Sequence, residues 1–363
     1  MKKSFLLVIF VLVIAIIIVG CGSPDEDSTE VEEDATSTSV TTEEDVENGE
    51  SELSDSEQQT QKNKNNIEEY SKVAYSPFSG NPINKTYLEK AVMFSVENSV
   101  KSRPQSGLAE APIVYEFLVE GGVTRFLALY WGEFPEKIGP IRSARPYLIE
   151  TAKDYNALLV HAGASPRGFA MLNKEDISHL DQINNGKNFW RGNSRKAPHN
   201  LYTGSNKIKE YVSNLTGQEY DSRFNFGVTF YTDKEAKAKK IKIQFWGNNL
   251  IGYKYDEDAK NYKRFYSKYE IAHLVDSQKQ LTADNIIVQF VQTKAIDKIG
   301  RLSMDLKSGG KCLLFKDGIV IEGYWEKEEN KWTKYYNQNG EELKLNPGRT
   351  WIEMVPTTVD VEY

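Results

Sequence analysis

The stretch IVYEFLVEGGVTRFLALY, residues 113–130, decides the fold of this 363-residue chain. Two runs rich in β-branched and aromatic residues flank Gly121 and Gly122, and this pattern predicts two antiparallel strands joined by a two-residue turn. Further buried strands are predicted at residues 91–96 and 157–160, with helices after residues 143 and 165. Residues 75–220 are therefore expected to form an α+β or α/β domain with a mixed sheet.

The charges of this hairpin are expected to pair with one another. In the predicted register Leu118 faces Arg125, so Glu116 and Glu120 become the diagonal neighbours of Arg125. A charged residue inside an apolar strand normally needs a partner. We therefore expect Glu116, Glu120 and Arg125 to form a structural charge cluster and not a ligand contact.

The chain after residue 220 follows a different pattern. Strand-like runs recur at residues 241–246, 250–255, 285–291, 311–315, 319–325 and 351–355. Asp317-Gly318 and Asn339-Gly340 are strong hairpin turns. Repeated short strands of this kind predict a mostly β domain over residues 221–363.

The first 20 residues have the features of a lipoprotein signal peptide. Lys2 and Lys3 precede an apolar run over residues 5–19, and Gly20 and Cys21 follow it. We expect palmitate-type lipidation of Cys21, which would anchor the protein at the outer face of the cytoplasmic membrane. The alternatives are a plain signal peptide or a short membrane anchor.

A disordered acidic tether is expected over residues 21–74, because residues 25–61 hold 15 Asp and Glu and no Lys or Arg. Of the chain's 45 basic and 52 acidic residues, four lysines and these 15 acids lie before residue 65, so the remainder carries a small positive excess. So small an excess does not favour nucleic acid as a partner. The expected partners are the membrane, through the lipid anchor, and a cell-wall polymer or an envelope protein.

Two arginines flank a predicted helix start in the sequence GPIRSARPY, residues 139–147. Ser143 is a candidate N-cap, and Pro146 is tolerated in a first helical turn. The free N–H groups of a helix start already favour negative charge, so Arg142 and Arg145 need an anion beside them. Either an outside ligand or a carboxylate of the hairpin must supply it.

Other polar groups suited to binding or catalysis fall in predicted loops and helix starts. His161 ends a buried strand, and Ser165 is placed to cap a helix that Pro166 begins. Rigid elements present functional groups at such places. Together with the arginines these groups form the candidate ligand site, which consists of Arg103, Arg142, Ser143, Arg145, His161, Ser165, His199 and Asn200.

Neither a metal nor a cofactor is expected. The histidines lack the spacing of three or four residues that metal motifs show, and they lie at His161, His179, His199 and His273. Cys312 stands in an apolar run, where a buried and inert thiol is expected.

Seven segments occur in one order along the chain. They are RPQSGL at residues 103–108, VEGGVTRF at 119–126, GPIRSARPY at 139–147, HAGASP at 161–166, APHNLY at 197–202, NIIVQ at 285–289 and NPGRTW at 346–351. Together they resemble the YerB-like bacterial lipoprotein family, which carries domain of unknown function 3048 in N-terminal and C-terminal parts. The resemblance covers roughly residues 75 to 360. It implies a surface lipoprotein of Gram-positive type, and it implies no activity.

These residues favour a binding module over an enzyme. The leading hypothesis is a cleft in the N-terminal domain that binds an anionic or polyhydroxylated cell-envelope ligand. One alternative is a cell-envelope hydrolase or transferase acting on a phosphodiester or glycan link, with His161 or His199 as the catalytic residue. The other is a scaffold lipoprotein that binds wall-synthesis proteins through aromatic side chains such as those of Tyr253 and Tyr255.

Overall fold

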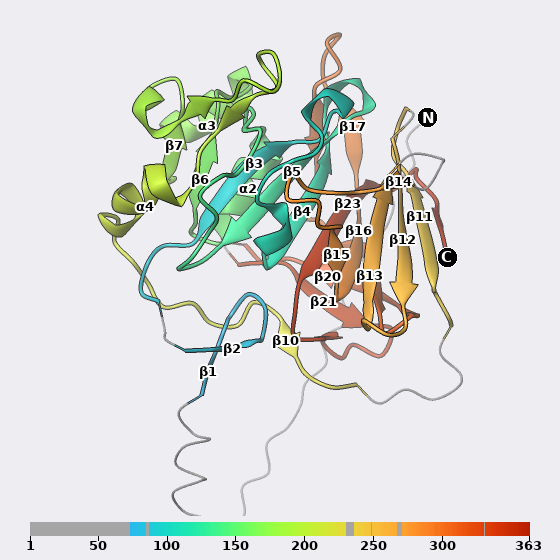
Figure 1. Cartoon of the computed structure of the whole chain (residues 1–363). Helices are drawn as coiled ribbons and strands as arrows, with labels where there is room; N and C mark the ends of the chain where they lie inside the picture. Colours follow the sequence, from blue (N-terminus) through green and yellow to red (C-terminus); the bar gives the residue numbers. More distant parts are fainter. Residues whose placement is uncertain (1–72, 85–86, 230–235, 248, 267–270, 330) are drawn as a thin grey trace, which may run out of the picture. The chain divides into compact units, whose positions relative to one another are not determined.

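A ten-stranded mixed sheet is the central element of the computed structural model (Figure 1). The structure describes residues 73–84, 87–229, 236–247, 249–266, 271–329 and 331–363, and all of them belong to one unit, residues 61–363. The strand order is β21-β20-β19-β16-β23-β4-β5-β3-β6-β7. The strands are β3 (Val92–Glu97), β4 (Ile113–Leu118), β5 (Thr124–Tyr130), β6 (Leu158–His161), β7 (His179–Asp181), β16 (Asn285–Val291), β19 (Gly310–Lys316), β20 (Ile319–Glu326), β21 (Lys334–Asn337) and β23 (Thr350–Pro356).

This sheet contains strands from both sides of residue 220. Strand β23 lies between β16 and β4 and is parallel to both. The pairs β3 with β6 and β6 with β7 are also parallel, and the remaining pairs are antiparallel. Every residue of β4, β5 and β23 is buried, which explains their nearly continuous apolar sequences. A large mixed sheet is thus present, but both parts of the chain contribute strands to it, whereas the sequence placed a mixed sheet within residues 75–220.

A six-stranded sheet packs on one face of the larger sheet. Its order is β14-β13-β12-β11-β24, with β15 beside β13. In β11 the side chains of Ile241 and Ile243 are buried, whereas those of Lys240, Lys242 and Gln244 face solvent. On the inner face, Tyr253 approaches Trp351 of β23, with ring centroids 6.5 Å apart. The strands are β11 (Lys240–Gln244), β12 (Leu250–Asp256), β13 (Asn261–Tyr266), β14 (Ile271–Ala272), β15 (Thr282–Ala283) and β24 (Val361–Glu362).

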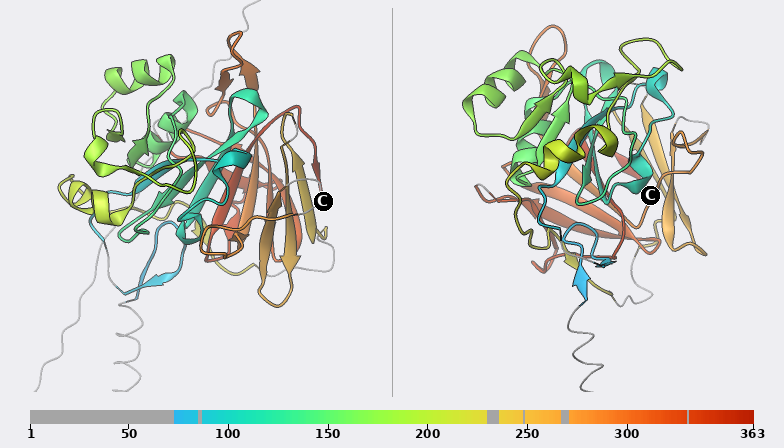
Figure 2. Two further views of the ribbon diagram at one scale, coloured as in Figure 1. Left: turned by 45° about the horizontal axis from the view of Figure 1, so that its top comes forward. Right: turned by 60° about the vertical axis from the view of Figure 1, so that its left-hand side comes forward.

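The described residues contain three helices, α2 (Pro146–Asp154), α3 (Pro166–Lys174) and α4 (Ser205–Ser213). Helix α2 covers the opposite face of the larger sheet, where the ring of Tyr147 lies 5.4 Å from that of Phe117. Helices α3 and α4 lie near β6 and β7, at the end of the molecule away from the six-stranded sheet (Figures 1 and 2). Within the described ranges, no helix is both long and apolar enough to cross a membrane. Short strand pairs complete the fold: β1 (Ala74–Tyr75) with β2 (Pro82–Ile83), β8 (Trp190–Arg191) with β9 (Leu201–Tyr202), β10 (Asn225–Phe226) with β22 (Lys344–Leu345), and β17 (Thr293–Ala295) with β18 (Leu302–Met304).

The β4–β5 hairpin differs from its predicted register by one residue. Arg125 pairs with Phe117, because residues 120–122 form a three-residue turn in which Gly121 and Gly122 have φ values of 72° and 69°. A shift of one residue moves a side chain to the other face of a sheet. Arg125 and Glu116 therefore lie on opposite faces, so Glu116 does not join the predicted cluster, whereas Glu120 and Arg125 still interact electrostatically.

Candidate functional site

The arginine segment, residues 139–145, lies across the carboxyl ends of β3 and β6. The amide of Arg142 donates to a carbonyl of β3 at 2.9 Å, and further backbone hydrogen bonds join the segment to the loop after β6. The chain stays extended through Arg145, as is usual before a proline, so α2 begins only at Pro146. The prediction that Ser143 caps this helix was therefore wrong, and Arg145 occupies the N-cap position.

Arg145 is neutralised inside the protein by Glu120 of the hairpin turn. Its Nε and one terminal nitrogen donate to the two carboxylate oxygens at 2.6 and 2.8 Å. Although burial opposes the effect, the hydrogen bonds from Arg145 lower the pKa of Glu120. A bidentate pair of this kind fixes the guanidinium plane as well as its charge.

Arg125 lies beneath the arginine segment. Its side chain donates to the carbonyl of Ser143, and the residue is only 6% exposed. Burial lowers the pKa of Arg125 to about 10, and repulsion from Arg145 acts in the same direction. The Nε of Arg125 is buried and has no hydrogen-bond partner among the described residues. Arg125 is therefore a buried cation without a carboxylate of its own.

Glu97, at the end of β3, brings two predicted site residues together. Its Oε1 lies 2.8 Å from Nδ1 of His199 and accepts a hydrogen bond from Ser99, also at 2.8 Å. Its Oε2 lies 3.5 Å from Nε of Arg142. That oxygen and that nitrogen are both buried without a hydrogen-bond partner in the described part of the chain. Sequence reasoning missed Glu97, because the strand carries it to the arginine segment from 45 residues away along the chain.

Arg103 and Asn200 hold the surrounding loops. The guanidinium of Arg103 donates to the side-chain and main-chain oxygens of Asn98, both at 3.0 Å, and lies 4.3 Å above the ring of Tyr266. Burial lowers the pKa of Arg103 to about 10. Asn200 donates to two carbonyls of its own loop, at 2.7 and 2.9 Å. Both side chains thus position the residues beside Glu97 and His199.

His161 is fully buried and supports the loop after β6. Its Nδ1 lies 2.8 Å from the carbonyl of Gly163, so Nδ1 carries the proton, and Nε2 accepts from His179 at 3.1 Å. Burial lowers the pKa of both histidines. Ser165 caps α3 as predicted, because its hydroxyl accepts from the amide of Gly168 at 3.2 Å. His161 and Ser165 therefore stabilise the loop after β6 and the start of α3, whereas Arg142 and His199 meet at Glu97.

Cys21, the predicted lipidation site, lies outside the described residues. Cys312 is fully buried, and burial raises the pKa of its thiol to about 12. Within the ranges that the structure describes, no group of three or more His, Cys, Asp or Glu side chains could hold a metal ion.

Comparison with known proteins assigns the chain to a family. The N-terminal model of a family described as "Protein of unknown function (DUF3048)" matches residues 78–219, and the C-terminal model matches residues 241–352. The chain belongs to the DUF3048 family. "Putative lipoprotein YerB" of Bacillus subtilis (strain 168) is 33% identical over 301 residues, which cover 81% of this chain and 89% of that protein. The crystal structure of YerB protein from Bacillus subtilis matches with a TM-score of 0.72 and 31% identity, over 80% of this chain and 100% of that one. The resemblance read from the sequence is confirmed.

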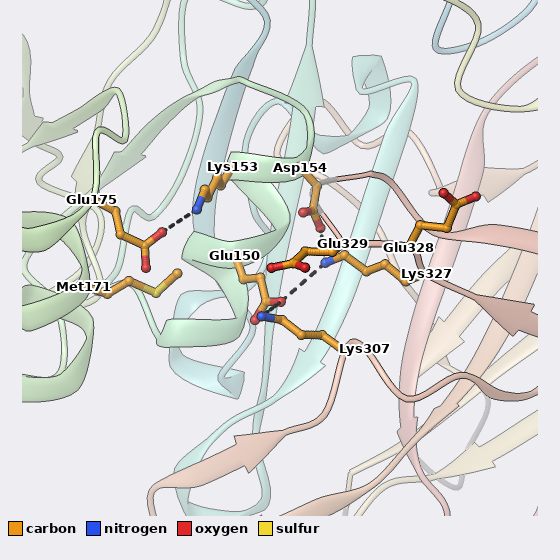
Figure 3. A pocket seen from close by; sticks show the side chains of 9 residues that line it. All are labelled: Glu150, Lys153, Asp154, Met171, Glu175, Lys307, Lys327, Glu328 and Glu329. Carbon is orange, nitrogen blue, oxygen red and sulfur yellow. Dashed lines mark hydrogen bonds and ion pairs between the residues drawn. The ribbon is translucent and has the colours of Figure 1, made fainter.

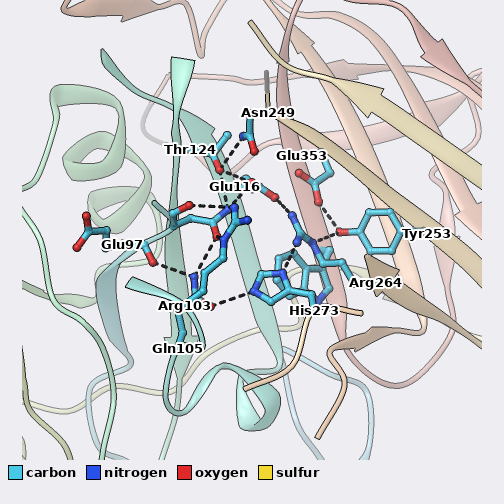
Figure 4. A network of polar contacts seen from close by, with 12 residues as sticks. Glu97, Arg103, Gln105, Glu116, Thr124, Asn249, Tyr253, Arg264, His273 and Glu353 are labelled. Carbon is cyan, nitrogen blue, oxygen red and sulfur yellow. Dashed lines mark hydrogen bonds and ion pairs between the residues drawn. The ribbon is translucent and has the colours of Figure 1, made fainter. Parts of the chain in front are cut away.

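A buried network joins the two segments of this DUF3048 chain that the family models match (Figure 4). Arg264 of β13 is fully buried and forms an ion pair with Glu116 of β4. It also donates to the hydroxyl of Tyr253 at 3.1 Å and to Nδ1 of His273. His273 then donates from Nε2 to Gln105 at 3.0 Å, which fixes a neutral imidazole.

The network continues to the strand end that carries the candidate site. The amide group of Gln105 donates to the carbonyl of Glu97 and to the side-chain oxygen of Asn98, both at 3.0 Å. Sequence reasoning gave His273 no role and did not single out Arg264. The inward position of Arg264, two residues after the buried Tyr262, is the signal that could have found it.

Proposed function

We propose that this DUF3048 protein is a lipoprotein, anchored through Cys21 at the outer face of the cytoplasmic membrane, that binds an anionic group of a cell-envelope ligand beside Arg142. The similarity to the Bacillus subtilis protein named putative lipoprotein YerB and the sequence around Cys21 support the first part. The observation that carries the second part is a surplus of guanidinium groups. Among the residues that the structure describes, the carboxylates close to Arg125, Arg142 and Arg145 are those of Glu97 and Glu120.

Arg142 is the group best placed for direct contact. Its side chain is 28% exposed, whereas Arg145 is held by Glu120 and Arg125 is nearly covered. A guanidinium fork matches the oxygen pairs of carboxylates and phosphates. The buried Arg125 adds positive potential below the segment, and an external anion would compensate for this potential. The hydroxyls of a polyhydroxylated ligand could reach the half-buried Ser143 next to Arg142.

The test is calorimetric titration of the full-length protein in detergent micelles with muropeptides and with teichoic-acid fragments. A hydrogen bond to a charged group contributes about 1.5–3 kcal/mol, so Arg142→Ala should weaken binding by roughly 10- to 150-fold. Arg301→Ala is the matched control, because it removes the same charge from a partly exposed pair with Asp297 in another part of the protein. Binding of none of these probes, or equal binding by the Arg142 variant, contradicts the proposal.

One observation also favours the hydrolase or transferase alternative. The buried Glu97 carboxylate holds Nδ1 of His199 at 2.8 Å while the imidazole stays 21% exposed, an arrangement that suits a general base. Arg142, on the other side of Glu97, could then stabilise negative charge in a phosphodiester or glycan substrate.

Incubating cell-wall material with the wild type should release soluble products if this second function is correct. His199→Ala should abolish the release, and His179→Ala is the control because that ring serves the loop after β6. Binding without any products would leave only the first function.

A further inference from the structure

A second site lies at the other end of α2. A pocket of about 510 Å³ opens between α2, the region of α3 and two segments from the later half of the chain (Figure 3). That volume falls within the range of roughly 300–1,000 Å³ typical of small-molecule sites. Eight of its nine lining residues are charged, and the ninth is Met171. The charged residues are Glu150, Lys153, Asp154, Glu175, Lys307, Lys327, Glu328 and Glu329.

One ammonium group is already bound between carboxylates in this pocket. The side chain of Lys327 is only 4% exposed, and its Nζ lies 2.6 Å from Asp154 and 3.4 Å from Glu150. Lys327 thus shows that these two carboxylates can bind an ammonium group. The carboxylate of Glu150 also pairs with Lys307, at the longer distance of 3.7 Å.

Negative charge exceeds positive charge among the lining residues, with five carboxylates against three ammonium groups. Glu329 points into it in Figure 3 and forms no ion pair among the described residues, whereas Glu328 points away and pairs with Lys331. Asp154 is the last residue of α2, where the helix dipole disfavours a carboxylate. Burial raises the pKa of Asp154 to about 6 in spite of Lys327, and Glu150 adds to this effect. An additional ammonium group would relieve this surplus.

The rim supplies the opposite charge. The side chain of Lys307 is 75% exposed and is held only loosely by Glu150. Lys153 is 45% exposed and pairs with Glu175 at 2.6 Å. The carboxylates would repel a ligand that carried only negative charge, and these lysines would repel a ligand that carried only positive charge.

We propose that this pocket binds a small zwitterion, either an amino acid or a short peptide, with its ammonium group at Glu150 and Glu329 and its carboxylate at Lys307. The arginine segment lies before the first residue of α2 and this pocket lies around the last, so the two sites are separate. The inference does not depend on anion binding at Arg142.

The probe is glycylglycine, titrated calorimetrically into the full-length protein in detergent micelles at low ionic strength. N-acetylglycylglycine removes its ammonium charge, and glycylglycinamide removes its carboxylate. Each blocked peptide should bind at least about tenfold more weakly, because each loses a charge-assisted contact. Absence of saturable glycylglycine binding overturns the proposal, as does equal binding of either blocked peptide.

Variants place the ligand within the pocket. Glu329→Gln and Lys307→Ala change exposed side chains and should each weaken glycylglycine binding about tenfold or more. Glu257→Gln is the matched control, because this exposed carboxylate pairs with Lys239 and does not line the pocket, so its binding should equal that of the wild type. Arg142→Ala should also bind glycylglycine normally, so failure at one site is distinguishable from failure at the other. Unchanged binding by Glu329→Gln and Lys307→Ala would refute the assignment.

Discussion

Replacing Arg264 by methionine tests whether the buried network holds the two family segments together. In Arg264→Met the carboxylate of Glu116 remains fully buried and loses its ion-pair partner. The aromatic surroundings cannot replace that partner, because the guanidinium lies 4.8 Å from the ring of Trp351 and 5.5 Å from the ring of Phe126. The substitution preserves most of the side-chain volume, so the main effect is an uncompensated charge.

The expected loss follows from measured cases of this kind. Removing one partner of a buried ion pair costs about 3–5 kcal/mol of unfolding free energy. For a folded body of about 290 residues, with an unfolding entropy of roughly 2.1 cal/mol/K per residue, this loss lowers the Tm by about 5–8 °C. Equilibrium urea unfolding of the full-length protein, followed by tryptophan fluorescence, measures it directly.

Glu116→Gln should cost less than half as much, for a reason that the network supplies. Burial raises the pKa of Glu353 well above its usual range, and the nearby Glu116 raises it further. When Glu116 becomes neutral, Glu353 can ionise and serve as the counter-ion of Arg264, while Tyr253 keeps its hydrogen bond to Glu353. Each of the two substitutions therefore removes one buried charge, but Arg264→Met should lower the free energy of unfolding more than Glu116→Gln.

The control for Arg264→Met is Arg301→Met, which breaks a partly exposed pair with Asp297 and should change stability by less than about 1 kcal/mol. Two results would refute the reasoning. One is a loss below about 1 kcal/mol in Arg264→Met. The other is an equal loss in Glu116→Gln, which would mean that Glu353 cannot take over the charge.

Three further outcomes are expected. Gly204→Ala should lose about 1–3 kcal/mol in urea unfolding, because a Cβ there would lie 1.9 Å from the carbonyl oxygen of Glu136, whereas Gly186→Ala, with nothing within 4 Å, should be nearly neutral. The pKa of Asp154 is raised to about 6, which means that folding favours its protonated form. The contribution of Asp154 to stability should therefore fall as pH rises from about 4 to about 6, so the urea midpoint of the wild type should fall relative to that of Asp154→Asn over this range. Cys312 should resist thiol reagents in the native protein and react on unfolding, as mapped by peptide mass, and native labelling at that residue would contradict its burial.

Local sequence patterns predicted many of the strands and turns of the fold. The turn at Asp317 and Gly318 is a two-residue hairpin, with φ values of 52° and 75° and Lys316 paired with Ile319, as its sequence predicts. The register of the β4–β5 hairpin was not recoverable from the sequence in the same way. Two adjacent glycines permit a turn of two or three residues, and the choice alone decides which face carries Arg125.

Contacts between distant segments lay beyond local patterns. The parallel pairing of β4 with β23 joins residues 113–117 to residues 350–354. No turn or residue spacing in the sequence predicts this pairing. The same holds for the candidate site. The need of Arg145 for an anion was predictable and Glu120 was among the hairpin carboxylates considered, but the pairing of His199 with Glu97 depends on the tertiary fold.

Helix α2 gives a physical reason to expect ions at both of its ends. A helix favours negative charge at its beginning and positive charge at its end, by about 0.3–1 kcal/mol for each exposed charge. Here the beginning has Arg145, with Arg142 three residues before it, and no acidic residue in its first turn, while the last turn has Asp154 next to Lys153, which pairs with Glu175. Glu120 and Lys327 offset part of this cost from other segments. The remainder is a positive surplus at one end and a negative surplus at the other, and an anion beside Arg142 and an ammonium group at Glu150, near Asp154, would each reduce it.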